Sequence, residues 1–140
     1  HLLTARNNNR VFLAGGELRA HDGGAFGAEA LDLVSRFHVQ FAVFSVGAVN
    51  SSFGFMLHDL AEANLAREAA RNAQVRIVVA DSEKFEKRAP VSIGKSGEID
   101  LFYTNQQPPE AICQMLATND IEMFVTAPPE RLDRVVPKQR

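Results

Sequence analysis

The stretch FAVFSVG, residues 41–47, is a continuous apolar run that ends at a glycine. A run this short, rich in Val and Phe, is typical of a strand buried on both faces of a parallel sheet. Four other segments share this length and composition: RVFLAG (10–15), VRIVVAD (75–81), IDLFYTN (99–105) and IEMFVTA (121–127). The sequence therefore predicts five buried strands.

Helical patterns lie between most of these strands. Residues 27–37 repeat an apolar residue at every third position, and residues 58–74 are alanine-rich and begin at Asp59, a favourable N-cap. Residues 108–120 place Pro109 in the first turn, where proline is tolerated. This alternation predicts an α/β fold: a three-layer sandwich with a mostly parallel sheet and right-handed crossovers.

The length of the chain indicates one domain. A chain of 140 residues that is 46% apolar can form a single core. We expect this domain to cover residues 1–127, with a small additional strand at 89–93, and residues 128–140 to be an exposed or partner-docked tail. The first ten residues, HLLTARNNNR, do not begin with Met and look like the end of a helix, so we expect a fragment of a longer protein.

Composition excludes several function classes. A net charge of −2 does not favour binding of a nucleic acid by this chain alone. Cys113 is the only cysteine and allows no internal disulfide, and neither a membrane span nor a signal peptide is recognisable, so a cytoplasmic location is expected. His21 and Asp22 have no partners at metal-ligand spacing. Without an activated nucleophile, the sequence predicts no enzyme, no metal and no cofactor.

Glycines and charged residues follow the first predicted strand. Ligands of open parallel sheets bind beyond the carboxyl ends of the strands, and glycines there allow close approach of the backbone. Candidate ligand-binding residues in this stretch are Gly15, Gly16, Glu17 and Arg19. An ordinary strand-to-loop turn is the alternative. The later HDGGAFG, residues 21–27, is interpreted as a flexible lead into the next helix.

Two further stretches carry polar side chains at the same predicted edge. Asp59 and Glu62 lie on one face of a helix at its N-terminus, where they could hold sugar hydroxyls or act only as a cap. Asp81, Ser82 and Lys84 follow a buried strand and suit an anion that carries hydroxyls, or form only a capped turn. The sequence leaves both alternatives open.

Taken together, five segments resemble the effector-sensing domain of the DeoR family of bacterial transcriptional repressors. They are VFLAGGELRAHDGGAFG, EALDLVSRFHVQFAVFSVGAV, GFMLHDLAEANLAREA, VVADSEKFEKRA and IDLFYTNQQPPE. The resemblance implies a sensor fold similar to ribose-5-phosphate isomerase and coenzyme-A transferases. It also implies an N-terminal winged helix-turn-helix, absent from this chain, that binds operator DNA, and a homo-oligomeric assembly. The members that this chain resembles most are induced by glycerol 3-phosphate.

The resemblance assigns roles to the candidate residues. It implies phosphate contacts from Arg19 and Lys84, hydroxyl contacts from Glu17, Asp59 and Glu62, and backbone access at the glycines. The chain departs from the family pattern at Ser45, Ala48, Asn50 and Ala66, and Arg67 is the candidate to replace the lysine usual at position 66. A sugar-phosphate isomerase and an oligomerisation module with a decayed pocket are the alternative functions.

Overall fold

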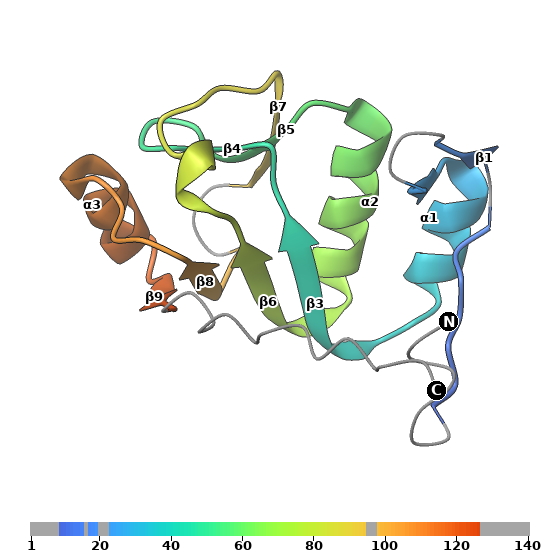
Figure 1. Cartoon of the computed structure of the whole chain (residues 1–140). Coiled ribbons are helices and arrows are strands. Elements are labelled where there is room, and N and C mark those ends of the chain that lie inside the picture. Colours follow the sequence, from blue (N-terminus) through green and yellow to red (C-terminus); the bar gives the residue numbers. More distant parts are fainter. Residues whose placement is uncertain (1–8, 16, 20–22, 95–97, 127–140) are drawn as a thin grey trace, which may run out of the picture.

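The computed structural model describes residues 9–126 except residue 16, residues 20–22 and residues 95–97. The predicted tail, together with Gly16, His21 and Asp22, lies outside the described residues. The fold is α/β with a mostly parallel central sheet and is consistent with a three-layer sandwich, as predicted (Figure 1). The elements are β1 (Glu17–Leu18), β2 (Ala25–Phe26), α1 (Ala28–Ser35), β3 (Val39–Ser45), β4 (Ala48–Asn50), β5 (Gly54–Leu57), α2 (Leu60–Arg71), β6 (Ala73–Val79), the 3-10 turn η1 (Ser82–Lys84), β7 (Val91–Gly94), β8 (Leu101–Thr104), α3 (Glu110–Thr118) and β9 (Glu122–Val125).

Four of the five predicted strands form the central sheet. Its order is β3-β6-β8-β9, and each neighbouring pair is parallel. Phe44 lies opposite Val78, and Val78 lies opposite Phe102, so one face of the sheet carries a row of large apolar side chains. The carboxyl ends of all four strands therefore lie at one edge of the sheet, as the sequence predicts.

The prediction of a fifth strand at residues 10–15 is wrong. The described residues of this run form no strand, and Val11, Phe12 and Leu13 are 47%, 58% and 78% exposed. Phe12 instead contacts Phe37, just beyond α1, at a centroid distance of 5.3 Å. A short apolar run can form a strand of a sheet or a loop whose side chains contact a neighbouring element. Composition alone could not distinguish these two structures.

Most of the short strands outside the central sheet were not expected. β4, β5 and β7 form an antiparallel sheet, of which only β7 corresponds to a predicted strand, the one at 89–93. β1 and β2 form an antiparallel hairpin of two residue pairs. Strands of two to four residues are too short for an alternating pattern to become visible in a sequence.

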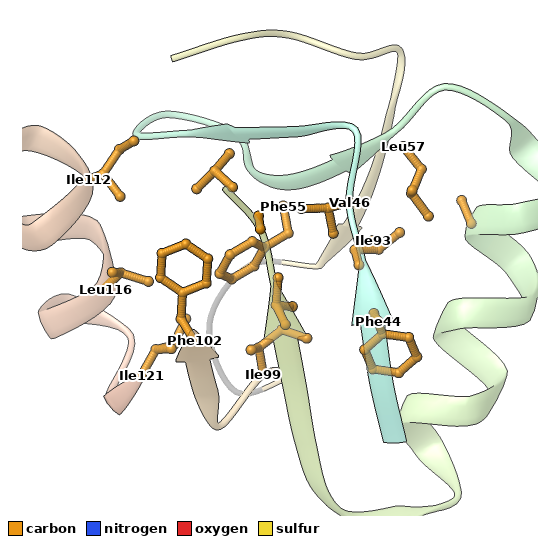
Figure 2. Close-up of a cluster of buried hydrophobic side chains, with 14 of the residues drawn as sticks. Phe44, Val46, Phe55, Leu57, Ile93, Ile99, Phe102, Ile112, Leu116 and Ile121 are labelled. Atoms are coloured by element: carbon orange, nitrogen blue, oxygen red, sulfur yellow. The ribbon is translucent and has the colours of Figure 1, made fainter. Parts of the chain in front are cut away.

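The core lies on one face of the parallel sheet. Phe102 is fully buried there, 5.5 Å from the ring of Phe55 in β5, and Ile112 and Leu116 of α3 join the same cluster (Figure 2). Each large side chain buried in this way stabilises the fold by roughly 1.5–3 kcal/mol. The small antiparallel sheet, α2 and α3 all contribute to this cluster.

The opposite face of the sheet is less covered than the sequence predicts. Exposed and buried residues alternate in β3 from Phe41 to Ser45, with Phe41 59% and Val43 64% exposed, and Val79 at the end of β6 is 45% exposed. Within the described part of the chain, the prediction that the strands are buried on both faces is therefore wrong. A continuous apolar run could not show this, because both faces of these strands carry apolar side chains.

The helices begin near their predicted starts. Asp59 is the N-cap of α2, as predicted, and its side chain accepts a hydrogen bond from the backbone N–H of Glu62. α1 packs against α2, and the N-terminus of α2 lies at the end of the molecule toward which β3 and β6 point (Figure 1). No helix among the described residues has the length and apolar character to span a membrane.

Candidate functional site

A pocket of about 350 Å³ lies at the N-terminus of α2. It is lined by Arg19, Phe26, Gly27, Asp59 and Ala61. These residues come from three places in the chain: the β1–β2 hairpin, the start of α1 and the start of α2. The structure thus brings Arg19 to Asp59, two candidate residues that are 40 positions apart in the sequence.

Arg19 contacts Glu62 and Phe26 beside this pocket. Its Nη2 atom donates to Oε2 of Glu62 at 3.2 Å, and both side chains are 26% exposed. Its guanidinium carbon lies 4.4 Å from the ring centroid of Phe26. An arginine in this setting has a defined orientation and keeps its positive charge at any physiological pH.

Asp59 and Glu62 have different surroundings. Asp59 Oδ1 accepts the N–H of Glu62 at 2.8 Å, so one of its oxygens stabilises the first turn of α2. Glu62 pairs with Arg19. Both interpretations of these carboxylates are therefore compatible with the structure, because a cap occupies one oxygen of Asp59 and leaves its other oxygen as an acceptor.

The N-termini of two helices contribute positive potential to the pocket. Gly27, the N-cap of α1, has φ 114°, a conformation that favours glycine, and no side chain caps this helix among the described residues. Ala61 belongs to the first turn of α2. Backbone N–H groups at helix starts attract anions, and Arg19 adds a full charge beside them. The side of the pocket at Arg19 and Gly27 is therefore suited to an anionic group, and the side at Asp59 to a hydrogen-bond donor.

The second candidate group occupies a separate turn. Asp81 accepts the backbone N–H of Glu83 at 2.9 Å, and the N–H of Ser82 donates to Oδ1 of Asn105 at 2.8 Å. Lys84 ends the η1 turn and is half-buried. These contacts join the carboxyl ends of β6 and β8, but none of the three candidate residues lines the pocket at Arg19.

The glycines of the first candidate stretch gain little support. Gly15 is exposed, and a Cβ atom there would meet no described atom within 4 Å, so its surroundings do not require glycine. Gly16 lies outside the described residues, and Glu17 is placed only as backbone of β1. In the HDGG stretch, interpreted as a flexible lead into the next helix, the described Gly23 donates to the carbonyl of Arg19 within the hairpin.

The departures from the family pattern do not line the pocket, and two of them, Ala48 and Asn50, are buried, whereas Ser45 is exposed at the end of β3. Ala48 is fully buried. Asn50 is 5% exposed; its side-chain oxygen accepts the N–H groups of Ser52 and Phe53, and its amide donates to Glu86. Gly47, which precedes Ala48, approaches His58 closely: a Cβ there would lie 2.7 Å from the ring of His58, so that side chain would have to move.

Positions 66 and 67 do not reach the pocket either. Ala66 packs against the core. Arg67 donates to the carbonyl oxygen of Ser92 in β7 and to Asn64, and it lines a different, smaller cavity of about 70 Å³. The structure therefore does not place Arg67 where it would replace a pocket lysine at position 66.

Sequence reasoning missed three pocket residues and one partner. Phe26, Gly27 and Ala61 line the pocket, and Asn105 accepts from Ser82. Asn105 ends a predicted strand and could have been recognised by the same argument as Asp81. Phe26 gave no signal, because its role depends on the pairing of β1 with β2, which is too short to predict.

A second arginine–carboxylate pair lies away from the pocket. Arg76 in β6 donates from Nε and Nη2 to the two oxygens of Asp100 at 2.8 and 2.7 Å, and its backbone N–H also donates to Asp100 at 2.7 Å. These hydrogen bonds hold the pKa of Asp100 below its ordinary value and raise the pKa of Arg76. The described residues contain no group of three or more acidic, His or Cys side chains that could hold a metal ion.

Comparison with known proteins places the chain in a family. The model described as "DeoR C terminal sensor domain" matches residues 1–106. The chain is 31% identical to the glycerol-3-phosphate regulon repressor of Escherichia coli K12 over 121 residues, covering 86% of this chain and 48% of the repressor. It is 32% identical to the transcriptional repressor CsqR of the same organism over 125 residues, covering 89% and 48%.

A more distant relative is the transcriptional repressor GlcR of Bacillus subtilis, 26% identical over 132 residues that cover 94% of this chain and 51% of GlcR. The chain thus spans about half the length of the relatives it matches. These relatives are named as repressors, and the matching family model is that of a sensor domain. The family match covers three quarters of the sequence, and the chain belongs to the DeoR C-terminal sensor domain family.

Proposed function

We propose that this domain senses a phosphorylated sugar or polyol for a transcriptional repressor, with glycerol 3-phosphate as the effector. Two of the observations above support the proposal. The chain belongs to a sensor-domain family, and one relative with 31% identity is named for the glycerol-3-phosphate regulon. The pocket at the start of α2 combines a cation with carboxylates, which matches the two chemical parts of such an effector.

The observation that carries the proposal is the position of Arg19 beside Asp59 on one pocket. The guanidinium and the N-terminus of α1 would bind the phosphate, because both attract oxyanions. Asp59 and Glu62 would accept hydrogen bonds from the hydroxyl groups. The effector phosphate would compete with Glu62 for Arg19, whose Nη2 atom lies 3.2 Å from Oε2 of Glu62.

The other candidate residues remain part of the proposal with smaller roles. Gly15, Gly16 and Glu17 precede Arg19 and would border the phosphate from the hairpin side. Asp81, Ser82 and Lys84 would form a more distant wall at the carboxyl ends of β6 and β8. Operator DNA would bind through an N-terminal winged helix-turn-helix in a cytoplasmic homo-oligomer, and effector binding would weaken that complex.

Calorimetric titration tests this proposal. The protein is titrated with glycerol 3-phosphate, glycerol, ribose 5-phosphate and inorganic phosphate at one ionic strength. We expect saturable binding of glycerol 3-phosphate and at least tenfold weaker binding of glycerol and of phosphate alone, because each lacks half of the contacts. Equal affinity for phosphate and glycerol 3-phosphate, or no heat with any phosphate ester at millimolar concentration, would contradict it.

A further inference from the structure

We infer that Phe26 is a positioning residue of the effector site: its ring orients the guanidinium of Arg19 toward the pocket before the effector binds. The inference rests on the proposed function for the identity of the ligand. The geometry on which the inference depends is independent of the identity of the ligand. Phe26 and Arg19 line the same pocket, and the guanidinium carbon lies 4.4 Å from the ring centroid.

The register of the hairpin explains why these two side chains meet. Glu17 pairs with Phe26 and Leu18 with Ala25, and the N–H of Arg19 donates to the carbonyl of Gly24 at 2.9 Å. Side chains two residues apart on a strand share a face, so Arg19 lies on the face to which Phe26 belongs, as its diagonal neighbour. Diagonal neighbours are close enough for a long side chain to reach a ring.

Glycine at position 24 makes this approach possible. Gly24 lies directly across from Arg19 in the hairpin and has no side chain. The position beside Arg19 is therefore open, and the arginine can extend diagonally over Phe26. Gly23 has φ 68°, a conformation that most residues with a Cβ adopt rarely. Its N–H donates to the carbonyl of Arg19, which places the neighbouring Gly24 in this register.

The ring and Glu62 constrain the guanidinium in complementary ways. The ring lies against the guanidinium at 4.4 Å, and Glu62 accepts from one terminal nitrogen at 3.2 Å. A solvent-exposed arginine loses much of its rotamer freedom when it binds an anion. Phe26 removes part of that freedom beforehand, so the effector phosphate meets an arginine whose orientation is already restricted.

Three variants separate this role from a general effect on folding. Phe26→Leu removes the ring and keeps an apolar side chain, whereas Phe26→Tyr keeps the ring. Phe53→Leu is the matched control, because Phe53 also lies near an arginine, with Arg88 5.2 Å from its ring centroid, but does not line the pocket. The fourth variant is Arg19→Gln, alone and combined with Phe26→Leu.

The first readout needs no ligand. In the NMR spectrum of the unliganded protein, the side-chain protons of Arg19 carry an upfield ring-current shift that Phe26→Leu abolishes and Phe53→Leu leaves unchanged. The second readout is the dissociation constant for glycerol 3-phosphate. We expect Phe26→Leu to raise it about tenfold, as for loss of a partly desolvated cation–π contact, and Phe26→Tyr and Phe53→Leu to change it less than twofold.

The double variant provides the decisive comparison. If Phe26 acts through Arg19, then Phe26→Leu changes the affinity less than twofold when Arg19 is already Gln. A full tenfold loss in that background, or an unchanged affinity in the single Phe26→Leu variant, would overturn the inference while wild-type binding keeps the proposed function intact. Absence of wild-type binding would instead overturn the proposed function, and the ring-current shift would still decide whether Phe26 orients Arg19.

Discussion

The two arginine–carboxylate pairs of this domain are built differently. Arg76 and Asp100 form a bidentate pair on neighbouring strands of the sheet, reinforced by a backbone hydrogen bond. Arg19 and Glu62 meet through one contact at 3.2 Å, on the edge of a pocket of about 350 Å³. Bidentate pairing with a backbone donor saturates the carboxylate, whereas a single-point pair can exchange its partner.

We propose from this difference that the Arg76–Asp100 pair stabilises the fold and that Arg19 exchanges Glu62 for the effector. The hydrogen bonds from Arg76 lower the pKa of Asp100, so this carboxylate is bound more favourably when charged. Arg19 is oriented by an aromatic ring as well as by Glu62. Substitutions at the first pair should therefore change stability, and substitutions at the second should change affinity.

The largest effect is expected for Arg19→Gln. Removing a charged donor to phosphate should weaken glycerol 3-phosphate binding by about 10- to 100-fold. Calorimetric titration measures this loss, and thermal unfolding should show a small change in Tm. Arg36→Gln is the matched control, because Arg36 forms an exposed ion pair with Asp32 on α1. Similar affinity losses in both variants would show that Arg19 contributes no more to effector binding than the exposed Arg36 does.

Asp100→Asn should destabilise the domain by about 1–2 kcal/mol, without changing effector affinity. Chemical denaturation measures the loss, and Asp32→Asn, in the exposed Arg36 pair, should cost at most about 0.5 kcal/mol. If the two substitutions cost the same, the bidentate geometry contributes nothing beyond a surface ion pair.

The same carboxylate predicts a pH dependence. The pKa of Asp100 is lowered in the folded state from an ordinary value of 3.8, chiefly by the hydrogen bonds from Arg76. The stabilisation is therefore complete above that ordinary value and is lost as the pH falls below it, because the unfolded chain binds the proton first. Unfolding free energies measured from pH 6 downward should fall less in Asp100→Asn than in the wild type.

At the pocket, Asp59 allows capping and ligand binding to be separated. Asp59→Ala removes the N-cap of α2 and should cost about 1 kcal/mol of stability, whereas Asp59→Asn retains a capping oxygen. If the carboxylate also binds effector hydroxyls, both variants should lose affinity by a few-fold. An unchanged affinity in the Asn variant would restrict Asp59 to the role of a cap.

The smallest effect is expected for Lys84→Ala. Lys84 ends the η1 turn and does not line the pocket at Arg19, so we expect the dissociation constant to rise no more than about twofold. The exposed Lys87→Ala, three residues further along the chain, is the control for loss of one positive charge. A tenfold loss for Lys84 alone would move the phosphate from Arg19 to the turn after β6.

The sequence predicted the elements that have strong local signals. β3, β6, β8 and β9 were recognisable as apolar runs, and Asp59 as the cap of α2. The run at 10–15 failed because its apolar residues pack without a ladder. The exposed face at Phe41 and Val43 could not be foreseen either, since an apolar side chain does not show whether another element covers it.

For the candidate site, residue types were predictable and proximity was not. Arg19, Asp59 and Glu62 were selected as separate groups, and only the packing of the hairpin near α2 brings them together. The sequence supported the turn at Asp81 as strongly as these residues. In the structure, however, Ser82 of that turn contacts Asn105 and not the pocket at Arg19. Phe26 became visible only through a pairing of two-residue strands.

A crystal structure of the protein with glycerol 3-phosphate tests the central claim most directly. We expect the phosphate to lie within hydrogen-bond distance of the Arg19 guanidinium, with Glu62 displaced from its present contact and Phe26 still against the arginine. A phosphate bound at Ser82 and Lys84, with the Arg19–Glu62 pair unchanged, would contradict it.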